Sequence, residues 1–527
     1  MSKTEVVLEA RPLNFPSVKE TVVGATAMLL GLALAKMMLH FAGIRHYGFF
    51  RDELYYMACG RHLAWGYVDQ PPLIAYLAWF AGHAFGHSIV ALRLLPVITG
   101  GAVVFLTGIL ARELGGNAFA QCLAALSVLF APAFLAFDSF FSMNAFEPLF
   151  WLLCAWLTLR IVRGASPRWW LAFGALAGVG LENKHTMLVF GFALVAGLIL
   201  AGESRVFRSK WIWIGALLAF ALFLPNLLWE ARHGWPQIEV VRNAQDLKNI
   251  PISPLEFLGD QVAFLNPLAL PVWLAGLAWL FLSREARPFR FLGWCYLIVL
   301  TIFLVLHGKS YYMLPAYPLL LAAGGVAIER FSHPVNRHWV RIALPAMIAV
   351  GGLGMAPFGV PFLPINTFLR YDRIVPAGEI AKTERDAQSV QLPQLYADMF
   401  GWDNIAVTVS RVYDALPPAE RSTCGILAGN YGEAGAIDYY GPALGLPNAL
   451  SGHNSYYDWG PGRYSGSCMI IFGERSSEYI KLFGEVRQAA VISSEHAMPN
   501  ERSIPVYVCH KPIAPLRELW PHFKMII

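Results

Sequence analysis

The chain has 527 residues, of which 56% are hydrophobic and 14% charged, and its mean hydropathy is +0.49. Soluble globular proteins carry about a quarter charged residues, so this composition excludes that class and indicates a polytopic membrane protein. The formal net charge of +5 does not indicate a nucleic-acid partner, because Lys and Arg stand in short clusters between apolar runs rather than on one basic face.

The beginning of the chain and its cysteines exclude two further classes. Residues 1–20 are polar, and the apolar run that follows reaches Leu39 without a small-residue cleavage site. We therefore expect a cytoplasmic N-terminal segment 1–20 and a retained first span. The seven cysteines show no CxxC or Cys/His ligand spacing, so a zinc or redox motif is unsupported. Cys424, Cys468 and Cys509 lie in the C-terminal part of the chain. Two of them could form a disulfide, or all three could be reduced thiols.

Apolar runs long enough to cross a bilayer recur along the chain, and about eleven spans are expected from the roughly 20 apolar residues that each crossing needs. They lie near 21–43, 90–111, 117–136, 141–162, 168–182, 186–202, 211–230, 266–283, 288–306, 311–328 and 339–360. The predicted organisation is a membrane domain at 21–362, with a first external loop at 44–89, followed by a separate domain at 365–527.

The distribution of Lys and Arg between these runs predicts the orientation, because short cytoplasmic loops retain positive charge. Alternate loops carry Arg112, Arg160, Arg163, Arg168, Arg205, Arg208, Lys210, Arg284, Arg287, Arg290, Arg330, Arg337 and Arg341. The opposite short loops carry only Lys184 and Lys309. We therefore expect the N-terminus inside, with the 44–89 loop and everything after about residue 365 outside.

Two apolar segments are too short to span the membrane comfortably. Residues 71–85 carry Tyr76 and Trp79, which suit the headgroup level, and 251–265 have a similar character. We expect both to be interfacial helices that cover the outer face of the bundle.

The composition becomes more polar and Gly-rich after about Asn366. The segments IAVTVSRVY, CGILAGN, CMIIFG and IPVYVC predict a helix or strand followed by short buried strands, hence a small α/β domain. Residues 429–462 combine Gly turns and tyrosines with Glu433, Asp438 and His453. This stretch has two possible interpretations. It could be a carbohydrate-binding surface or lid, or it could consist of structural turns.

Polar and ionisable side chains at membrane depth are costly and usually functional or paired. In this chain the unusual ones all map to outer loops or outer span ends, and one external cavity could hold them. They are Arg51, Asp52, Glu53, Tyr55, Asp69, Asp138, Asn144, Glu147, Lys184, His185, Lys309, Tyr311 and Tyr312.

Such a set suits transfer of a sugar from a lipid phosphate. Fixed cations would hold the phosphate leaving group, and a carboxylate would take the proton of an acceptor hydroxyl as an oxocarbenium-like centre develops.

Each residue also has a simpler interpretation. Asp52 and Glu53 suit the start of a helix near Leu54, Asp138 could cap the next helix, and the two lysines could reach to the interface. Asn144 and Glu147 are i,i+3 on one helix face, where Glu147 could be a buried hydrogen-bonding partner.

The motifs that hold these residues resemble a known family. They are RDELYY in the first outer loop, DQPPL, DSFFSMNAFEPLFW, LENKHTML and HGKSYYMLPAYPLL. Together they resemble glycosyltransferase family 39, the C-type (GT-C) membrane glycosyltransferases that include protein O-mannosyltransferases and aminoarabinose transferases. The resemblance implies an all-α polytopic membrane fold, here with a small C-terminal α/β domain outside the membrane.

The resemblance also implies roles. Asp52 would be the catalytic base and Glu53 would support acceptor or donor binding; Lys184 and Lys309 would contact phosphate; Tyr311 and Tyr312 would line the donor cavity. Relatives often carry a second Asp before the fourth span, where this chain offers Asp138 or the pair Asn144 and Glu147.

The leading hypothesis is an inverting glycosyltransferase of the cytoplasmic (inner) membrane that uses a polyprenyl-phosphate-linked sugar. It would modify an envelope protein, lipid or glycan on the external side. The alternatives are a transporter or flippase of lipid-linked sugars and a non-catalytic membrane protein that binds envelope glycans.

Asp52, Glu53 and Asp138 could share a divalent cation, and phosphate binding by Lys and Arg alone is equally workable. The donor sugar and the acceptor are not specified by the sequence.

Overall fold

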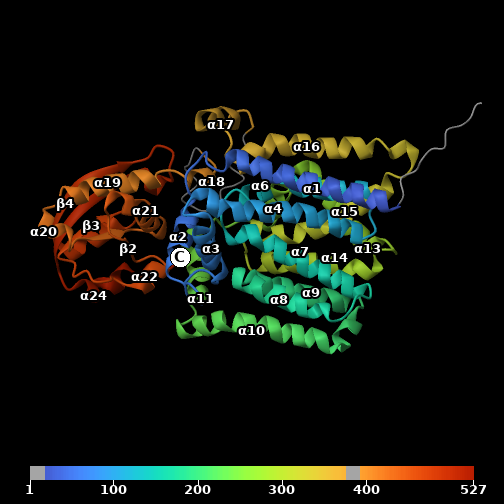
Figure 1. Cartoon of the computed structure of the whole chain (residues 1–527), viewed down its shortest axis with the longest axis horizontal. Helices are drawn as coiled ribbons and strands as arrows, with labels where there is room; N and C mark the ends of the chain where they lie inside the picture. The colour runs from blue at the N-terminus through green and yellow to red at the C-terminus, as the bar shows by residue number, and fades with distance from the viewer. Residues whose placement is uncertain (1–17, 376–391) are drawn as a thin grey trace, which may run out of the picture.

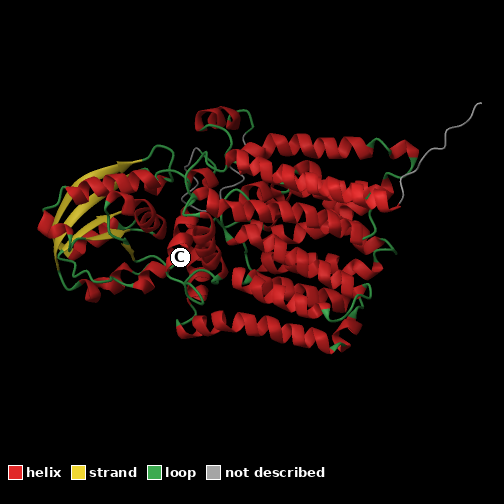
Figure 2. Cartoon of the chain, viewed as in Figure 1, coloured by secondary structure: helices red, strands yellow, loops and turns green. Residues whose placement is uncertain are grey.

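The computed structural model describes residues 18–375 and 392–527. Most of the predicted cytoplasmic segment 1–20, and residues 376–391 of the predicted C-terminal domain, lie outside this range. A bundle of helices runs along the long axis of the molecule, and a smaller unit that contains all described strands stands at one end of it (Figures 1 and 2). The predicted fold class, an all-α membrane bundle with a small C-terminal α/β domain, is confirmed.

Helices lie within each predicted span, but 117–136 contains two of them, α5 (Ala118–Leu129) and α6 (Pro132–Phe137), and fewer of the described helices than the expected eleven are long enough to cross a membrane. The helices in the other spans are α1 (Val18–Gly43), α4 (Ile89–Glu113), α7 (Met143–Val162), α8 (Trp169–Asn183), α9 (Thr186–Leu200), α10 (Lys210–Arg232), α13 (Leu270–Leu282), α14 (Arg290–Val305), α15 (Tyr317–Phe331) and α16 (Val340–Gly359). Among the described residues, 7 helices are long and apolar enough to cross a membrane, or 8 if one bent pair is a single span. Others, such as α5 and α9, are shorter apolar helices. The chain is therefore a multi-pass membrane protein.

The outer faces of the bundle have the composition that hydrocarbon requires. Large apolar side chains stand exposed there, among them Met38 at 71%, Leu217 at 66% and Val350 at 71%. Inside the bundle, small residues let backbones approach closely, as is common between membrane helices. A Cβ added at Gly324 of α15 would lie 2.0 Å from the Val272 carbonyl oxygen of α13, so this helix pair depends on glycine.

The basic loops collect at the end of the bundle opposite the sheet. Helix α1 begins at that end (Figure 1), and Arg112 at the end of α4 donates to Thr26 of α1 at 3.3 Å. Arg163 pairs there with Glu113 at 2.8 Å. The 44–89 loop and the C-terminal sheet domain lie together at the other end, as the charge pattern predicts.

Short helices lie across the sheet-proximal end of the bundle. Helices α2 (Arg51–Arg61), α3 (Leu73–Phe85) and α11 (Pro236–Asn243) stand between the bundle and the sheet (Figure 1). Helix α12 (Pro254–Phe264) is bent by 92° against the Pro267–Leu282 segment that contains α13. Helices therefore form within both predicted interfacial segments, and the bend at α12 turns that helix across the direction of the spans.

The C-terminal domain contains a five-stranded sheet with the order β2-β1-β3-β5-β4. The strands are β1 (Gly425–Ala428), β2 (Leu450–Ser451), β3 (Cys468–Phe472), β4 (Phe483–Ser493) and β5 (Ser503–Pro512). Strand β1 pairs in parallel with β2 and β3, whereas β5 pairs antiparallel with β3 and β4. The segments expected as strands are β1, β3 and β5, and IAVTVSRVY lies in helix α19 (Trp402–Asp414).

Both faces of the central strands are buried, which explains their continuous apolar sequences. Ile426 and Ile470 pack with Trp402 of α19 on one face. Leu427 and Ile471 pack on the other face, where α24 (Leu516–Leu519) contributes Leu516. The remaining short helices of the described chain are α17 (Ile365–Asp372), α18 (Gln394–Ala397), α20 (Pro418–Arg421), α21 (Tyr431–Tyr440), α22 (Ser455–Trp459) and α23 (Ser476–Tyr479).

Cys424 and Cys468 form a disulfide at the start of β1 and β3, and Cys509 is a free buried thiol. The bridge joins residues 44 positions apart, and closing a loop of this length stabilises a fold by about 2–4 kcal/mol. We expect a reductant to lower the thermal unfolding midpoint of the wild-type protein but not that of the Cys424→Ser, Cys468→Ser double variant. Equal midpoints of the wild type with and without reductant would contradict this assignment.

Candidate active site

Helix α2 begins at the RDELYY motif and divides its acidic pair between two environments. The N–H of Arg51 donates to the Asp398 carbonyl at 3.1 Å, which attaches the helix start to the C-terminal domain. Asp52 and Glu53 occupy the first turn, where negative charge is favourable. Glu53 turns inward and Asp52 lies at a cavity.

Glu53 is completely buried in a polar network. Its carboxylate accepts from Arg93 Nε at 2.9 Å and Nη2 at 2.7 Å, and from the backbone N–H of Phe141 and of Phe50, each at 2.8 Å. This pair connects α2 with α4 and with the loop before α7. The contacts give Glu53 a structural role, and its predicted part in substrate binding stays a prediction. Arg93 was missed, although a single Arg within an apolar span is a signal for a buried partner.

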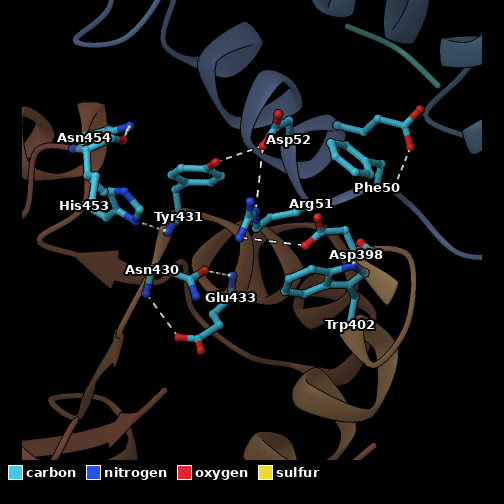
Figure 3. A network of polar contacts seen from close by, with 12 residues as sticks. Phe50, Arg51, Asp52, Asp398, Trp402, Asn430, Tyr431, Glu433, His453 and Asn454 are labelled. Carbon is cyan, nitrogen blue, oxygen red and sulfur yellow. Dashed lines mark hydrogen bonds and ion pairs between the residues drawn. The ribbon is translucent and has the colours of Figure 1, made fainter. Parts of the chain in front are cut away.

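Asp52 remains 29% exposed and is held by two side chains (Figure 3). The Tyr431 hydroxyl donates to Asp52 Oδ1 at 2.8 Å, and Arg51 Nε lies 3.9 Å from the same oxygen. Arg51 also lies 3.8 Å from the carboxylate of Asp398. Of the two predicted acidic residues, Asp52 is the one that a substrate can reach.

The cavity beside Asp52 has a volume of about 190 Å³ and mainly apolar walls. Its polar lining consists of Arg51, Asp52, Asn144, Lys309, Tyr311 and Gln394, and its apolar lining includes Phe137, Phe140, Phe264, Met355, Phe358 and Leu395. An apolar pocket with a few convergent polar groups is the usual form of a small-molecule site.

A second cavity of about 640 Å³ adjoins the first. It is lined by Glu256 and Asp260 of α12 and by the 305–310 loop, and both cavities share Phe264 and Lys309. Lys309 Nζ also lies 5.9 Å from the centre of the Tyr311 ring. Lys309 thus stands where the two cavities meet.

Lys184 brings the predicted i,i+3 pair together. Its ammonium donates to Asn144 Oδ1 at 2.8 Å and to Glu147 Oε2 at 3.0 Å, and it lies 4.3 Å from the centre of the Tyr312 ring. Glu147 accepts a further hydrogen bond from Thr186. The charge of Lys184 is therefore balanced by Glu147, and only Asn144 of this group lines the cavity.

Three of the predicted site residues form contacts with side chains outside the Asp52 cavity. Asp138 is buried against Lys36 of α1 at 2.6 Å. His185 contacts Asn226 at 3.0 Å. The Tyr55 hydroxyl donates to Asp69 at 2.7 Å and lies 2.8 Å from the Ser455 hydroxyl. Neither Asp138, His185 nor Tyr55 is among the described residues that line the Asp52 cavity.

These pairings bear on the divalent cation considered for Asp52, Glu53 and Asp138. Arg93 already neutralises Glu53, and Lys36 neutralises Asp138. Within the described ranges, the metal-type side chains that converge are Glu420, Cys468 and His510, of which Cys468 is in the disulfide. The Asp52 cavity instead offers Arg51 and Lys309 as cations for a phosphate.

The C-terminal domain supplies the residues that the sequence did not predict, namely Tyr431, Asp398 and Gln394. Tyr431 is the first residue of α21, and the helix begins with a capping box between Asn430 and Glu433. The Gly-rich stretch therefore contains a helix that packs on α2 as well as turns. The stretch contains several tyrosines, but nothing in their spacing indicates a contact with Asp52.

Behind Arg51 lies a second buried carboxylate, Glu501. Burial raises the pKa of Glu501 from 4.5 to about 8, Arg51 opposes this increase and Asp398 adds to it. The folded state therefore keeps a proton that the unfolded chain loses, and stability falls as pH rises from about 4.5 to about 8. We expect Glu501→Gln to flatten this dependence of the thermal unfolding midpoint. Glu495→Gln, at an exposed carboxylate of the same region, is the control, and equal pH profiles of Glu501→Gln and the wild type would contradict the assignment.

The helical membrane domain with a small sheet-containing C-terminal domain at one end has the architecture of the GT-C fold of membrane glycosyltransferases. The family described as dolichyl-phosphate-mannose-protein mannosyltransferase matches residues 69–229. This range includes the DQPPL, DSFFSMNAFEPLFW and LENKHTML motifs. No curated protein matches the chain.

Among solved structures, the chain is similar to ArnT from Cupriavidus metallidurans. The structure of ArnT bound to undecaprenyl phosphate matches with a TM-score of 0.60 and 15% identity, over 93% of this chain and 98% of ArnT. The apo structure matches with a TM-score of 0.60 and 16% identity, over 92% and 98%. These findings confirm the predicted resemblance to glycosyltransferase family 39 and the GT-C fold.

Proposed function

We propose that this protein transfers a sugar from a polyprenyl-phosphate-linked donor to an envelope protein, lipid or glycan. The observation that carries the proposal is the composition of one cavity. Asp52, a carboxylate that can accept a proton, shares this mainly apolar cavity with the cations Arg51 and Lys309. The family match and the fold of ArnT, which was solved with undecaprenyl phosphate, support the same conclusion.

In this proposal each part of the cavity binds one part of the donor. The first prenyl units lie against the aromatic wall formed by Phe137, Phe264 and Phe358, and the phosphate lies near Lys309 and Arg51. Cations fixed at a leaving phosphate stabilise the charge that develops on it. Arg51 and Lys309 supply positive charge for this role.

Asp52 is the general base of a single displacement. The acceptor oxygen forms a bond to the anomeric carbon of the sugar while the bond from that carbon to the phosphate oxygen breaks. The electron pair of the broken bond remains on the phosphate, and the acceptor proton moves to Asp52. One displacement inverts the anomeric configuration.

We place the site on the external side of the cytoplasmic membrane. The basic loops lie at the end of the bundle opposite the site, and short cytoplasmic loops retain positive charge. The Cys424–Cys468 disulfide lies in the domain next to the site, and disulfides persist in oxidising compartments. Both observations favour an N-terminus inside and a C-terminal domain outside.

The test compares envelopes of a deletion strain with those of the complemented strain. Mass spectrometry of lipids, glycoproteins and glycans is expected to show one component that loses a single sugar mass in the deletion strain. The wild-type gene should restore this mass, which identifies both sugar and acceptor. Identical envelopes in the two strains would contradict the proposed function.

A further inference from the structure

The C-terminal domain contacts the acidic helix start directly through Tyr431. The Tyr431 hydroxyl donates to Asp52 Oδ1 at 2.8 Å, between residues 379 positions apart (Figure 3). Tyr431 itself is only 5% exposed. A buried hydroxyl of the outer domain therefore holds one oxygen of the carboxylate that lines the cavity.

The surroundings of Tyr431 fix the plane of its ring. The ring stacks on Tyr55, with centroids 4.6 Å apart and planes inclined by 25°, and its centroid lies 4.5 Å from that of His453. The Arg51 guanidinium lies 5.8 Å from the ring centre. Stacking and cation–π contacts of this kind favour the observed orientation of the Tyr431 ring.

The backbone that carries Tyr431 is fixed as well. Asn430 Oδ1 accepts from the N–H of Glu433 at 2.9 Å, and Glu433 Oε2 accepts from the N–H of Asn430 at 3.1 Å, so two backbone donors at the start of α21 are satisfied. A Cβ added at Gly432 would lie 2.5 Å from Arg51 Cγ, and one added at Gly435 would lie 2.9 Å from Leu54 Cβ. The two glycines thus let α21 approach the helix that bears Asp52.

We propose that Tyr431 is a positioning residue for sugar transfer. Its hydroxyl holds Asp52 by Oδ1 and so orients Oδ2 toward the acceptor hydroxyl; this role rests on the proposed function. In the transfer step the acceptor proton moves to Oδ2 as the acceptor oxygen replaces the phosphate oxygen at the anomeric carbon. Tyr431 keeps its own proton throughout. The C-terminal domain then contributes a residue to the active site.

The test uses the full-length Tyr431→Phe variant, which keeps the ring and its stacking but removes the donor. The matched control is Tyr456→Phe. Tyr456 is also buried, its ring stacks on Tyr55 with centroids 6.3 Å apart, and its hydroxyl donates to Asp438 Oδ2 at 2.8 Å rather than to Asp52. The probes are labelled polyprenyl-phosphate hexose and pentose donors, with membranes of the deletion strain as acceptor.

We expect Tyr431→Phe to lower kcat by about 10- to 100-fold, because misplacing a reacting group costs rate. The KM for the donor should stay within about twofold of the wild-type value, because the lost interaction acts on the chemical step. Tyr456→Phe should retain wild-type turnover. If Tyr431 acts through Asp52, adding Tyr431→Phe to Asp52→Asn should cause no further loss.

Three results would overturn the assignment. Wild-type kcat in Tyr431→Phe, or an equal loss in Tyr456→Phe, would show that the hydroxyl has no specific role. A further independent loss in the double variant would show that Tyr431 does not act through Asp52. A wild-type protein that transfers no sugar from any donor would instead remove the proposed function, and with it the role of Tyr431.

Discussion

Replacement of Asp52 by Asn is expected to reduce sugar transfer by about 10²–10⁴-fold, the range that a general base contributes. Asn has the size of Asp and can still accept from Tyr431, but it cannot take a proton from the acceptor. The loss should appear in kcat, measured with the purified protein and a labelled lipid-linked donor. The KM for the donor should change little, because Arg51 and Lys309 remain in place.

The control for this variant is Asp403→Asn. Asp403 is an exposed residue in the first turn of α19, and it is not among the residues that line the Asp52 cavity. It should leave turnover unchanged. Full activity of a folded Asp52→Asn protein would exclude Asp52 as the base.

Arg93→Met is expected to cause the largest loss of stability. It leaves the fully buried carboxylate of Glu53 without its cation, and breaking a buried pair in this way costs about 3–5 kcal/mol. The thermal unfolding midpoint and the yield of monodisperse protein should both fall. The double variant Arg93→Met, Glu53→Gln should recover part of the loss, because neither charge is then buried alone.

An exposed ion pair provides the comparison. Arg475 lies 2.8 Å from Glu478, and their side chains are 32% and 56% exposed, respectively. Arg475→Met should cost only about 0–1 kcal/mol, as is usual for surface pairs. Equal effects of Arg93→Met and Arg475→Met would contradict the structural role assigned to the Glu53–Arg93 pair.

The membrane part of the fold could be predicted because each span carries its own signal. An apolar run such as 90–111 specifies a helix without reference to the rest of the chain, and the Arg residues between runs specify which ends lie together. The turn at Asn266 and Pro267 likewise separates an interfacial helix from a span. Strand β4 gave no such signal, because most of its side chains are exposed and its one apolar run, AAVI, is short.

The site could be predicted only in part. The acidic pair of α2 is noticeable because charge is rare in this chain, but the different surroundings of Asp52 and Glu53 depend on Arg93, which lies 40 positions from Glu53. Asp138 was one candidate for the cavity, beside the pair Asn144 and Glu147, but it is held by Lys36 in the first apolar span. No local pattern connects residues so far apart in sequence.

The contact of Tyr431 also could not be predicted from a local sequence pattern. The Gly-rich stretch around it suggested either a carbohydrate surface or turns, and both interpretations considered the domain by itself. Its contact with Asp52 arises only when α21 packs on α2, through glycines whose role appears in three dimensions. The part of the candidate site that the C-terminal domain contributes could therefore be seen only in the structure.

Sugar transfer is tested most directly by following one labelled donor in proteoliposomes of the wild-type protein. Membranes of the deletion strain are added to supply the acceptor. We predict that the labelled sugar becomes covalently attached to an acceptor and that one polyprenyl phosphate is released for each sugar transferred. Labelled donor that crosses the bilayer with its sugar still on the lipid, while no acceptor gains label, would contradict the account and identify a transporter.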